Sequence, residues 1–445
     1  MHEHFRRIAL TVCVLLGTVS APAARAEVLC RSPHQCRQPD SMTVLLQPGG
    51  SQVVLDANFG LVYQSPQGGW EYTCDDIFGG RIPYRTQIHR DGRVFVPSMS
   101  GLWVGSGGCG WIPATGALAN MAVYDVAFDP KDGQRIWIVG GDPRTLALST
   151  DGGKSFVAKQ TFAASLLFIR VAVAPSDPNV IYATGFNGTK VPLVLAVSTD
   201  GGTTWALDEN ASMGIASSTQ IVDFLGIAPD DPSTIYVVVT DPPGDQIWKS
   251  TAKGKNFVKV LTLADAEEWP RGGFSFGADG KTVYVAGFDP LNTGTQAPAS
   301  LYLSHDAGQT WMRRPSPSTG PRYRCVGFRD DRLYGCAGET LSGDTFLLGT
   351  SSNEGQSWAP LVRLNDVVGP NACVAGKCMA TVDFLRTFSA GDGGAPDAAA
   401  PRPDAARPVP VSKSGCAFAG DAPASPAWLL LVLAGLVVRR KIGGG

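Results

Sequence analysis

The chain has 445 residues and a formal net charge of -2, so nothing in its charge favours a nucleic-acid partner or an anionic membrane surface. It contains 53 Gly, 32 Pro and 10 Trp but only 17% charged residues. This composition suits a turn-rich, all-β protein rather than a helical or nucleic-acid-binding one.

Residues 1–26 have the features of a secretory signal peptide. Arg6 and Arg7 supply positive charge, residues 8–19 form an apolar run, and residues 24–26 (Ala-Arg-Ala) have the small-x-small pattern of a cleavage site. The apolar run is too short to span a bilayer, so we expect the segment to be removed. The sequence therefore predicts an exported protein.

Eight of the nine cysteines that follow the signal peptide lie in residues 27–386. An even number of cysteines in an exported chain favours disulfides over free thiols. The eight are Cys30, Cys36, Cys74, Cys109, Cys325, Cys336, Cys373 and Cys378. Short sequence separations favour the pairs Cys30–Cys36, Cys325–Cys336 and Cys373–Cys378, which leaves Cys74–Cys109.

An eight-residue element recurs five times between residues 149 and 358. Its copies are STDGGKSF at 149–156, STDGGTTW at 198–205, STAKGKNF at 250–257, SHDAGQTW at 304–311 and SSNEGQSW at 351–358. The shared pattern is Ser-x-Asp-x-Gly-x-Ser/Thr-aromatic. The copies at 149 and 198 match it almost fully, whereas the copy at 250 lacks the Asp and the copy at 351 has Asn353 in its place.

This pattern resembles the Asp-box, or BNR repeat, of sialidases, sortilin-like receptors and photosystem II assembly factors. The resemblance implies a β-propeller in which the box is structural and lies away from any active site. The Asp can accept hydrogen bonds from N–H groups of its own turn, the Gly can take a positive φ, and the aromatic can fill the core where the next strand begins. The box residues are Ser149, Asp151, Gly153, Phe156, Ser198, Asp200, Gly202, Trp205, Ser304, Asp306, Gly308, Trp311, Gly355 and Trp358.

A second recurring mark precedes each box: a turn followed by an apolar residue and an aromatic. The aromatics are Trp137, Tyr182, Tyr236, Tyr284 and Tyr334. Each mark predicts a hairpin, as between the apolar segments 123–128 and 136–140. Two strands, a longer loop and two more strands around the Asp-box make a four-stranded blade.

Weaker versions of the unit occur upstream, near residues 47–70 and 90–111. Closing aromatics then lie 41 to 54 residues apart, at Trp70, Trp111, Phe156, Trp205, Phe257, Trp311 and Trp358. The sequence therefore predicts an all-β fold, a β-propeller of seven four-stranded blades over residues 27–386. Six or eight blades remain the alternatives, because the first two units are degenerate. We expect strands after Trp358, including Met379–Leu385, to help close the ring.

The rest of the chain has a different character. Residues 387–415 are rich in Ala, Pro, Gly and Asp and predict a disordered linker. Residues 416–445 combine Cys416, a short apolar run that predicts a hydrophobic helix, and the basic residues 439–441. They resemble the carboxy-terminal sorting signal typical of myxobacterial surface proteins. That resemblance implies that Cys416 is processed and lipidated and that the protein is anchored at the cell envelope; a single-pass tail anchor is the alternative.

A sialidase-like glycoside hydrolase is the alternative to a binding protein. Sialidases carry an Arg-Ile-Pro motif, which occurs here at residues 81–83, three arginines that clamp a carboxylate, a Tyr–Glu pair and an Asp acid/base. Here Gly80 replaces the aromatic before Arg81, the first good Asp-box lies about 70 residues downstream, and the other roles cannot be assigned.

No other catalytic or metal-binding motif is present. The chain lacks GxSxG, HExxH, P-loop, EF-hand and CxxC motifs, and only His34, His89 and His305 follow the signal peptide, so we expect no metal site and no cofactor. The favoured prediction is a non-enzymatic, exported cell-surface propeller that binds or scaffolds a protein, peptide or glycan, with no nucleic-acid partner. The rim loops around Arg81–Arg85 and Arg322–Arg324 are the candidate contact regions.

Overall fold

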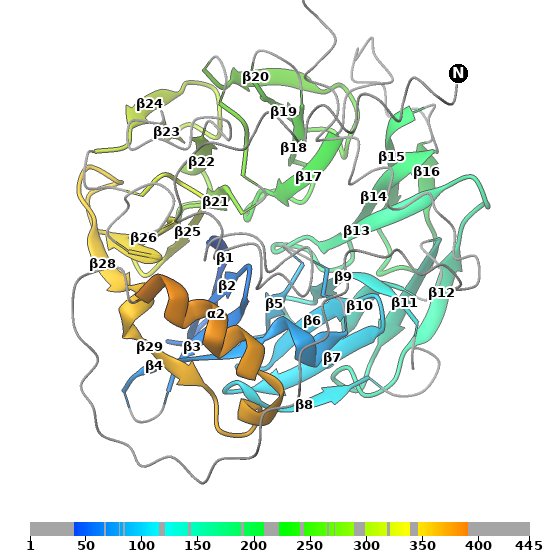
Figure 1. Ribbon diagram of the computed structural model, residues 1–445. Coiled ribbons are helices and arrows are strands. Elements are labelled where there is room, and N and C mark those ends of the chain that lie inside the picture. Colours follow the sequence, from blue (N-terminus) through cyan, green and yellow to red (C-terminus); the bar gives the residue numbers. More distant parts are fainter. Residues whose placement is uncertain are drawn as a thin grey trace, which may run out of the picture. The chain divides into compact units, whose positions relative to one another are not determined.

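A computed structural model shows how the chain folds (Figure 1). It describes residues 40–65, 68–79, 81–82, 85–114, 121–140, 144–187, 191–208, 222–240, 244–264, 267–270, 272–288, 299–317, 321–338 and 346–389. The chain divides into two compact units, Met1–Gly394 and Ala395–Gly445. The predicted signal peptide, Cys30, Cys36 and the predicted anchor with Cys416 lie outside the described residues.

The first unit is a propeller of seven antiparallel four-stranded blades, which confirms the predicted fold. Blade 1 comprises β1 (Ser41–Leu46), β2 (Val53–Ala57), β3 (Gly60–Gln64) and β4 (Trp70–Cys74). Blade 2 comprises β5 (Gln87–Ile88), β6 (Val94–Ser98), β7 (Gly101–Ser106) and β8 (Cys109–Pro113). Blade 3 comprises β9 (Val123–Phe128), β10 (Ile136–Gly140), β11 (Thr145–Ser149) and β12 (Val157–Thr161).

The remaining blades repeat this plan in chain order. Blade 4 comprises β13 (Leu167–Val173), β14 (Ile181–Asn187), β15 (Val191–Ser198) and β16 (Ala206–Asp208). Blade 5 comprises β17 (Val222–Ile227), β18 (Ile235–Val239), β19 (Gln246–Ser250) and β20 (Val258–Thr262). Blade 6 comprises β21 (Phe274–Phe276), β22 (Val283–Phe288), β23 (Ala299–Ser304) and β24 (Met312–Pro315). Blade 7 comprises β25 (Cys325–Arg329), β26 (Arg332–Cys336), β27 (Leu348–Ser351) and β28 (Ala359–Val362).

Burial falls from the inside of each blade to the outside. The first strands of successive blades contact one another and surround the centre of the ring (Figure 1). The second strands β10 and β18 are buried at every residue, whereas the fourth strands β12 and β20 are largely exposed. Second strands are continuously apolar because both faces of a blade pack against its neighbours, as in sheets covered on both sides.

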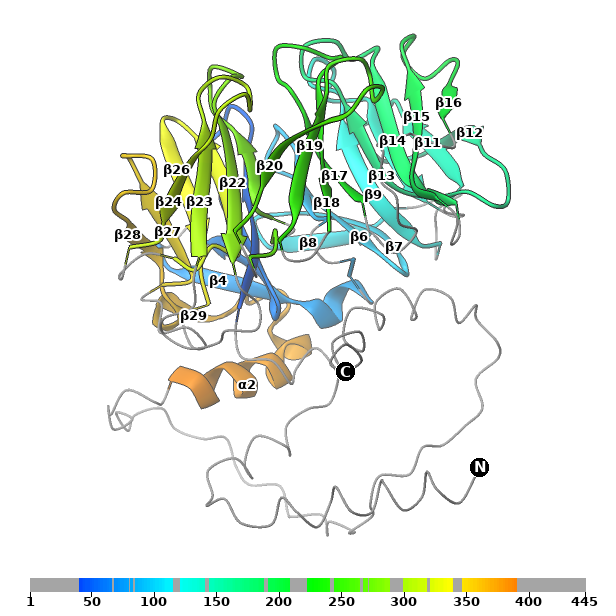
Figure 2. The ribbon, with the colours of Figure 1, turned by 90° about the horizontal axis from the view of Figure 1, so that it is seen from above.

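The propeller ring closes through a segment that follows blade 7. After the short turn η4 (Leu364–Asp366), β29 (Val367–Pro370) pairs in parallel with β4 at the outer edge of blade 1. The turn η5 (Ala375–Lys377) and the helix α2 (Met379–Ser389) follow, and α2 lies outside one face of the ring (Figure 2). We call residues 367–389 the strap.

The prediction that Met379–Leu385 forms a strand is wrong. These residues are the first turns of α2, which also includes the first three residues assigned to the predicted linker at 387–415. Cys378, Thr381 and Leu385 are buried, and Val382 packs against the same core. Their spacing of three and four residues is that of one helical face, whereas a strand would bury alternate residues.

Three disulfides are present among the described residues. Cys325–Cys336 joins the paired strands β25 and β26, as predicted. The other two predicted pairs are wrong: Cys74 bonds Cys378 and Cys109 bonds Cys373. The reason is ring closure, since Cys74 at the end of β4 and Cys109 at the start of β8 both lie beside the strap.

These two bonds link residues 304 and 264 positions apart. A single crosslink that closes a loop of this length restricts the unfolded chain by roughly 5–6 kcal/mol in the chain-entropy estimate. Once one of these disulfides has formed, the other closes a much shorter loop in the unfolded chain and therefore contributes less to the free energy of unfolding. Together they fix the strap across blades 1 and 2.

The two marks found in the sequence form the joint between neighbouring blades. In three blade pairs the aromatic of a second strand lies against the Asp-box turn of the following blade, whereas Gly254 and Gly355 face Leu195 and Leu301 of the preceding blade instead. A Cβ on Gly202 would lie 2.2 Å from the Trp137 ring of blade 3, and one on Gly153 would lie 2.9 Å from Phe95 of blade 2. Tyr236 of blade 5 donates a hydrogen bond to Ala307 O in the Asp-box of blade 6, at 2.7 Å. The glycine of the box therefore leaves room for the ring of the preceding blade.

We predict that Gly202→Ala lowers the free energy of unfolding by roughly 3 kcal/mol or more, because its Cβ adds strain at positive φ and overlaps the Trp137 ring. Gly201→Ala is the matched control: its φ is also positive, its Cβ would have no neighbour closer than 3.4 Å, and Ala307 occupies the same position in blade 6. It should cost about 1 kcal/mol. Equal losses in urea unfolding would contradict the proposed joint.

Candidate functional site

The Asp-boxes fold as self-contained turns. Ser149 Oγ accepts the Gly153 N–H at 2.8 Å and donates to Asp151 Oδ1 at 2.7 Å. Asp151 Oδ1 also accepts the N–H groups of Lys154 and Ser155, and its Oδ2 accepts the Ser155 hydroxyl at 2.6 Å. These hydrogen bonds all come from the turn that contains the carboxylate, which supports a structural role.

The other copies repeat this network with graded losses. The same bonds join the Ser, Asp and Gly of two further boxes, Ser198, Asp200 and Gly202 in blade 4 and Ser304, Asp306 and Gly308 in blade 6. The closing tryptophan of three boxes also donates a hydrogen bond to the carbonyl of the box glycine; these are Trp205, Trp311 and Trp358. In blade 7 Asn353 replaces the Asp, accepts the Ser357 N–H and donates to its hydroxyl. In blade 5 Ala252 occupies the Asp position, yet Ser250 Oγ still accepts the Gly254 N–H.

The boxes also define one face of the ring. They connect third and fourth strands, and because strands alternate in direction, those turns lie on the same side as the hairpins between first and second strands. We call this the hairpin face. The opposite side, where segments connect second to third strands and one blade to the next, is the connection face. Phe156 and Phe257, like the tryptophans, lie at the start of the fourth strand.

A cavity of about 910 Å³ occupies the centre of the ring. Residues of all seven first strands contribute to its wall, and it extends to hairpin residues such as Pro48, Arg90 and Pro130. Its aromatic lining consists of Phe128, Phe224, Trp269, Phe274 and Phe328. Polar residues, among them Thr43, Gln87, His89, Arg90 and Arg170, line the cavity as well, and its volume is that of a ligand-binding site.

Four charged residues from successive blades form an ionic cluster beside the central cavity, and we call this region the channel. Arg170 of β13 binds both oxygens of Asp223 of β17, with Nε–Oδ1 at 3.1 Å and Nη2–Oδ2 at 3.4 Å. Arg85 Nη2 lies 3.8 Å from Asp223 Oδ1. Asp125 of β9 accepts the Val171 N–H on Oδ2 at 3.0 Å. Asp223 is thereby held between two arginines.

Asp125 is the carboxyl group of this cluster with an open oxygen. It is buried, and its Oδ1 has no hydrogen-bond partner among the described residues; the same holds for Arg85 Nη1. Burial raises the pKa of Asp125 to about 7, although the charge of Arg85 opposes the rise. Asp125, Arg170 and Gln87 supply the polar lining of a smaller pocket of about 180 Å³ beside the main cavity. Near neutral pH this pocket thus holds a carboxyl group that can either donate or accept.

The sequence analysis missed Asp125, Arg170 and Asp223. A usable signal was present: each is a charged residue inside an otherwise apolar first strand, in VYDVAF, LFIRVAV and VDFLGI. Charged residues are seldom buried unless they are paired. Three such residues in successive repeats therefore indicate a buried ionic group near the axis.

The Arg-Ile-Pro residue Arg81 is not in the channel. It is buried between blades 1 and 2, where it forms an ion pair with Asp56, donates to Asp75 at 2.9 Å and donates to Ala57 O at 2.8 Å. Burial raises the pKa of Asp56 to about 6 even though Arg81 favours its charged form. Arg81 therefore has a structural environment rather than that of a substrate clamp, while Arg85, from the same candidate region, belongs to the ionic cluster.

The second candidate region, Arg322–Arg324, is also tied into the fold. Arg324 Nε lies 3.4 Å from Asp40 Oδ2, and its guanidinium stacks over Phe288 at 4.4 Å. Tyr323 is fully buried and meets the Trp358 ring edge to face. Only Arg322 and Arg324 of this segment retain partial exposure.

A Tyr–Glu–Arg set does exist, but in blade 6 rather than at the cavity. Buried Glu267 accepts hydrogen bonds from Tyr302 at 2.6 Å and from Arg313 at 2.8 Å. Burial and this carboxylate raise the pKa of Tyr302. Tyr302 and Arg313 lie on the third and fourth strands, so the set anchors the segment that carries Trp269.

Within the described ranges no group of His, Cys, Asp and Glu could hold a metal ion, and no helix there is long and apolar enough to cross a membrane.

We predict that Asp200→Ala lowers the melting temperature most above pH 4. The Thr204 hydroxyl and N–H groups of the turn hold the pKa of Asp200 at about 2, so the stabilisation is complete above the ordinary pKa and disappears as pH falls from about 4 to 2. Asp200→Asn should be milder, because Asn353 fills the same role in blade 7. Thermal scans between pH 2 and 7 measure this; an equal loss for both variants at every pH would contradict it.

Asp125 should show the opposite pH dependence. Its pKa is higher in the folded state than the ordinary value of 3.8, so its contribution to stability falls as pH rises from about 4 to 7. Asp125→Asn keeps an acceptor for Val171 N–H and removes the ionisation. The variant should match the parent near pH 4.5 and melt at a higher temperature at pH 8. A variant that is less stable than the parent at pH 8 would show that the ionised carboxylate stabilises the cluster.

No protein-family model and no curated protein sequence matches the chain. Among solved structures, it is similar to a GH74 xyloglucanase from Xanthomonas campestris, with 17% identity and a TM-score of 0.45 over 64% of this chain and 46% of that one. It is also similar to YCF48 bound to D1 peptide, with 17% identity and a TM-score of 0.35 over 53% of this chain and 67% of that one. A third similar structure is the extracellular domain of a putative one-component system from B. thetaiotaomicron, with 11% identity and a TM-score of 0.45 over 71% of this chain and 38% of that one. The chain spans less than half the length of the xyloglucanase, and these likenesses assign no activity.

Proposed function

We propose that the protein is an exported, non-enzymatic β-propeller that binds a protein, peptide or glycan in its central cavity. The observation that carries the proposal is the cavity of about 910 Å³, whose aromatic wall offers contact area. Aromatic residues are the ones that contribute most to recognition surfaces. Polar side chains share the wall with them, including those of Thr43, Gln87, His89, Arg90, Asp129 and Arg170.

The environment of the channel carboxylates favours binding over hydrolysis. A glycosidase uses two carboxyl groups on either side of the scissile bond, one as acid and one as base or nucleophile. Asp223 is instead engaged by Arg170 and approached by Arg85, which leaves Asp125 as the single carboxyl of the cluster with an open oxygen. The alternative, a sialidase-like hydrolase, would also need an arginine clamp that Arg81 does not supply from its buried position.

Export and surface anchoring complete the proposal. Disulfides persist in oxidising compartments, and three are present in the described part of the chain. Residues 1–26 supply the export signal, and residues 390–415 would act as a spacer to an anchor that begins at Cys416. The strap ends with α2 on the connection face.

The test is to fill the cavity without disturbing the core. Ser275→Trp places a large side chain on the wall of the cavity, and Lys159→Trp places the same side chain on the exposed strand β12. Against arrays of peptides and glycans, we expect the parent and Lys159→Trp to bind the same members and Ser275→Trp to lose at least ten-fold in affinity, about 1.4 kcal/mol.

The same preparations should be assayed with a fluorogenic sialoside, for which we expect no turnover. Turnover by the parent that Ser275→Trp abolishes would replace the proposal with the hydrolase. Unchanged binding by a folded Ser275→Trp would move the ligand site out of the cavity. Melting temperatures of both tryptophan variants serve as the control for folding.

A further inference from the structure

The three disulfides differ in their access to solvent. Cys74, Cys378, Cys325 and Cys336 are 0% exposed. Cys373 is exposed and its partner Cys109 is partly exposed. Thiol–disulfide exchange requires a thiolate to reach a disulfide sulfur, so access separates Cys109–Cys373 from the other two.

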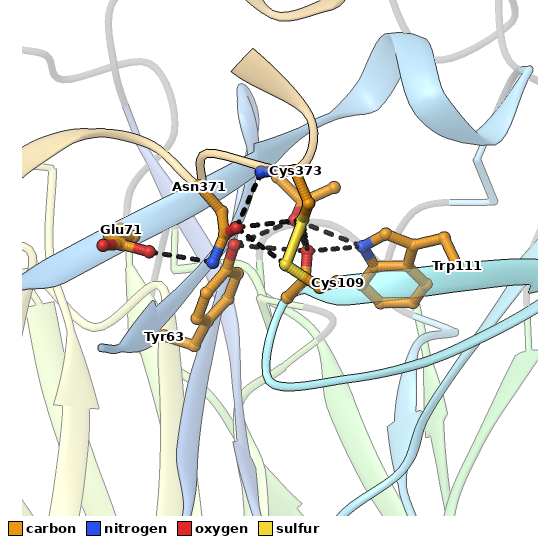
Figure 3. Close-up of a disulfide and its surroundings, with 8 residues drawn as sticks. Tyr63, Glu71, Cys109, Trp111, Asn371 and Cys373 are labelled. Carbon is orange, nitrogen blue, oxygen red and sulfur yellow. Dashed lines mark hydrogen bonds between the residues drawn. A yellow bond between two sulfur atoms is a disulfide. The ribbon is translucent and has the colours of Figure 1, made fainter. Parts of the chain in front are cut away.

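An amide oxygen lies against both sulfurs of the exposed bond. Asn371 Oδ1 is 2.7 Å from Cys109 Sγ and 2.9 Å from Cys373 Sγ (Figure 3). Its orientation is fixed, because the Asn371 amide donates to Glu71 Oε2 at 2.8 Å and the Cys373 N–H donates to Oδ1 at 3.1 Å. Disulfide sulfurs carry no proton, whereas two thiols could both donate to this oxygen. In the reduced state this oxygen could therefore accept thiol hydrogen bonds that the disulfide cannot make.

The surroundings would also keep the two thiols together. Gly108 O, next to Cys109, accepts hydrogen bonds from Trp111 Nε1 and Thr73 Oγ1, both at 2.9 Å, which hold this turn against blade 1 (Figure 3). On the other side, Cys373 lies five residues before Cys378, which the buried bond attaches to Cys74. Neither tether depends on the Cys109–Cys373 bond.

We propose that Cys109–Cys373 is a reversible thiol–disulfide exchange site for a dithiol, while Cys74–Cys378 and Cys325–Cys336 are permanent. A thiolate of the dithiol attacks the exposed Cys373 sulfur and Cys109 leaves as a thiolate. The second thiol of the reagent then displaces Cys373. One protein disulfide and one dithiol thus become two protein thiols and one reagent disulfide, and two electrons pass to the protein.

Reduction would change the surface without opening the ring. Blade 1 keeps β29 on its outer edge and keeps the buried bond to Cys378. The segment between Asn371 and Cys378 loses its link to blade 2. The site would act as a local switch where the strap meets blades 1 and 2, rather than as a trigger of unfolding.

The test is a titration of the native full chain with dithiothreitol, followed by alkylation with iodoacetamide and peptide mass spectrometry. We expect Cys109 and Cys373 to be alkylated together at concentrations that leave Cys74, Cys378, Cys325 and Cys336 bonded. Removal of the reductant in the presence of oxidised dithiothreitol should restore the same pair. The proposal fails if another disulfide is reduced first, or if Cys109–Cys373 resists until the chain unfolds.

A variant of Asn371 tests whether its side-chain amide, and not only the solvent exposure of the bond, makes Cys109–Cys373 easy to reduce. Asn371→Leu keeps the branched shape and removes the acceptor, so it should need about five-fold more dithiothreitol for half reduction. Cys325–Cys336, far from this site in the fold, is the internal control and should titrate as in the parent. An unchanged midpoint for Cys109–Cys373 would mean that exposure alone sets its reducibility and that Asn371 does not stabilise the dithiol.

Discussion

The rest of the propeller depends on one joint, in which the aromatic ring of a second strand packs beneath the glycine of the next blade's box. Trp137 against Gly202 and Tyr236 against the box of Ala307 and Gly308 are two examples. A four-stranded blade has two apolar faces and cannot bury either alone. The joint sets the distance and angle at which the faces of successive blades meet. It also explains why the box needs a glycine there, since a side chain would occupy the space of the ring.

A ring built from consecutive blades must still join its last blade to its first. No strand of blade 7 comes from the start of the chain, so the joint between blades 7 and 1 has no covalent continuity. The strap replaces it: β29 extends blade 1, and the two long-range disulfides bind the strap to blades 1 and 2. The largest apolar cluster follows the same path, from Tyr334 of blade 7 through Tyr72 of blade 1 to Leu385 of α2. Packing and crosslinks thus reinforce the same seam.

In the channel, the cost of removing charged groups from water opposes the attraction between them. Arg85, Asp125, Arg170 and Asp223 are withdrawn from water, and the desolvation of paired charges can exceed their attraction. Asp125 reports this cost directly, because burial raises its pKa despite the nearby arginine. Apolar residues at these positions would fill the channel at no such cost. The burial of these charged groups beside the cavity is therefore not explained by stability alone.

The sequence by itself determined the seven-blade all-β fold, because the box and hairpin marks are local turn chemistry repeated at nearly constant spacing. It also found Cys325–Cys336, whose partners lie on adjacent strands of one hairpin. Only the tertiary structure decided the pairs Cys74–Cys378 and Cys109–Cys373, the helical state of Met379–Leu385, the burial of Arg81 and the meeting of four charged residues in the channel. The two disulfide pairs depend on how the ends of the propeller come together when the ring closes, and spacing along a sequence carries no information about that closure. The burial of Arg81 and the meeting of the channel charges depend on how neighbouring blades pack.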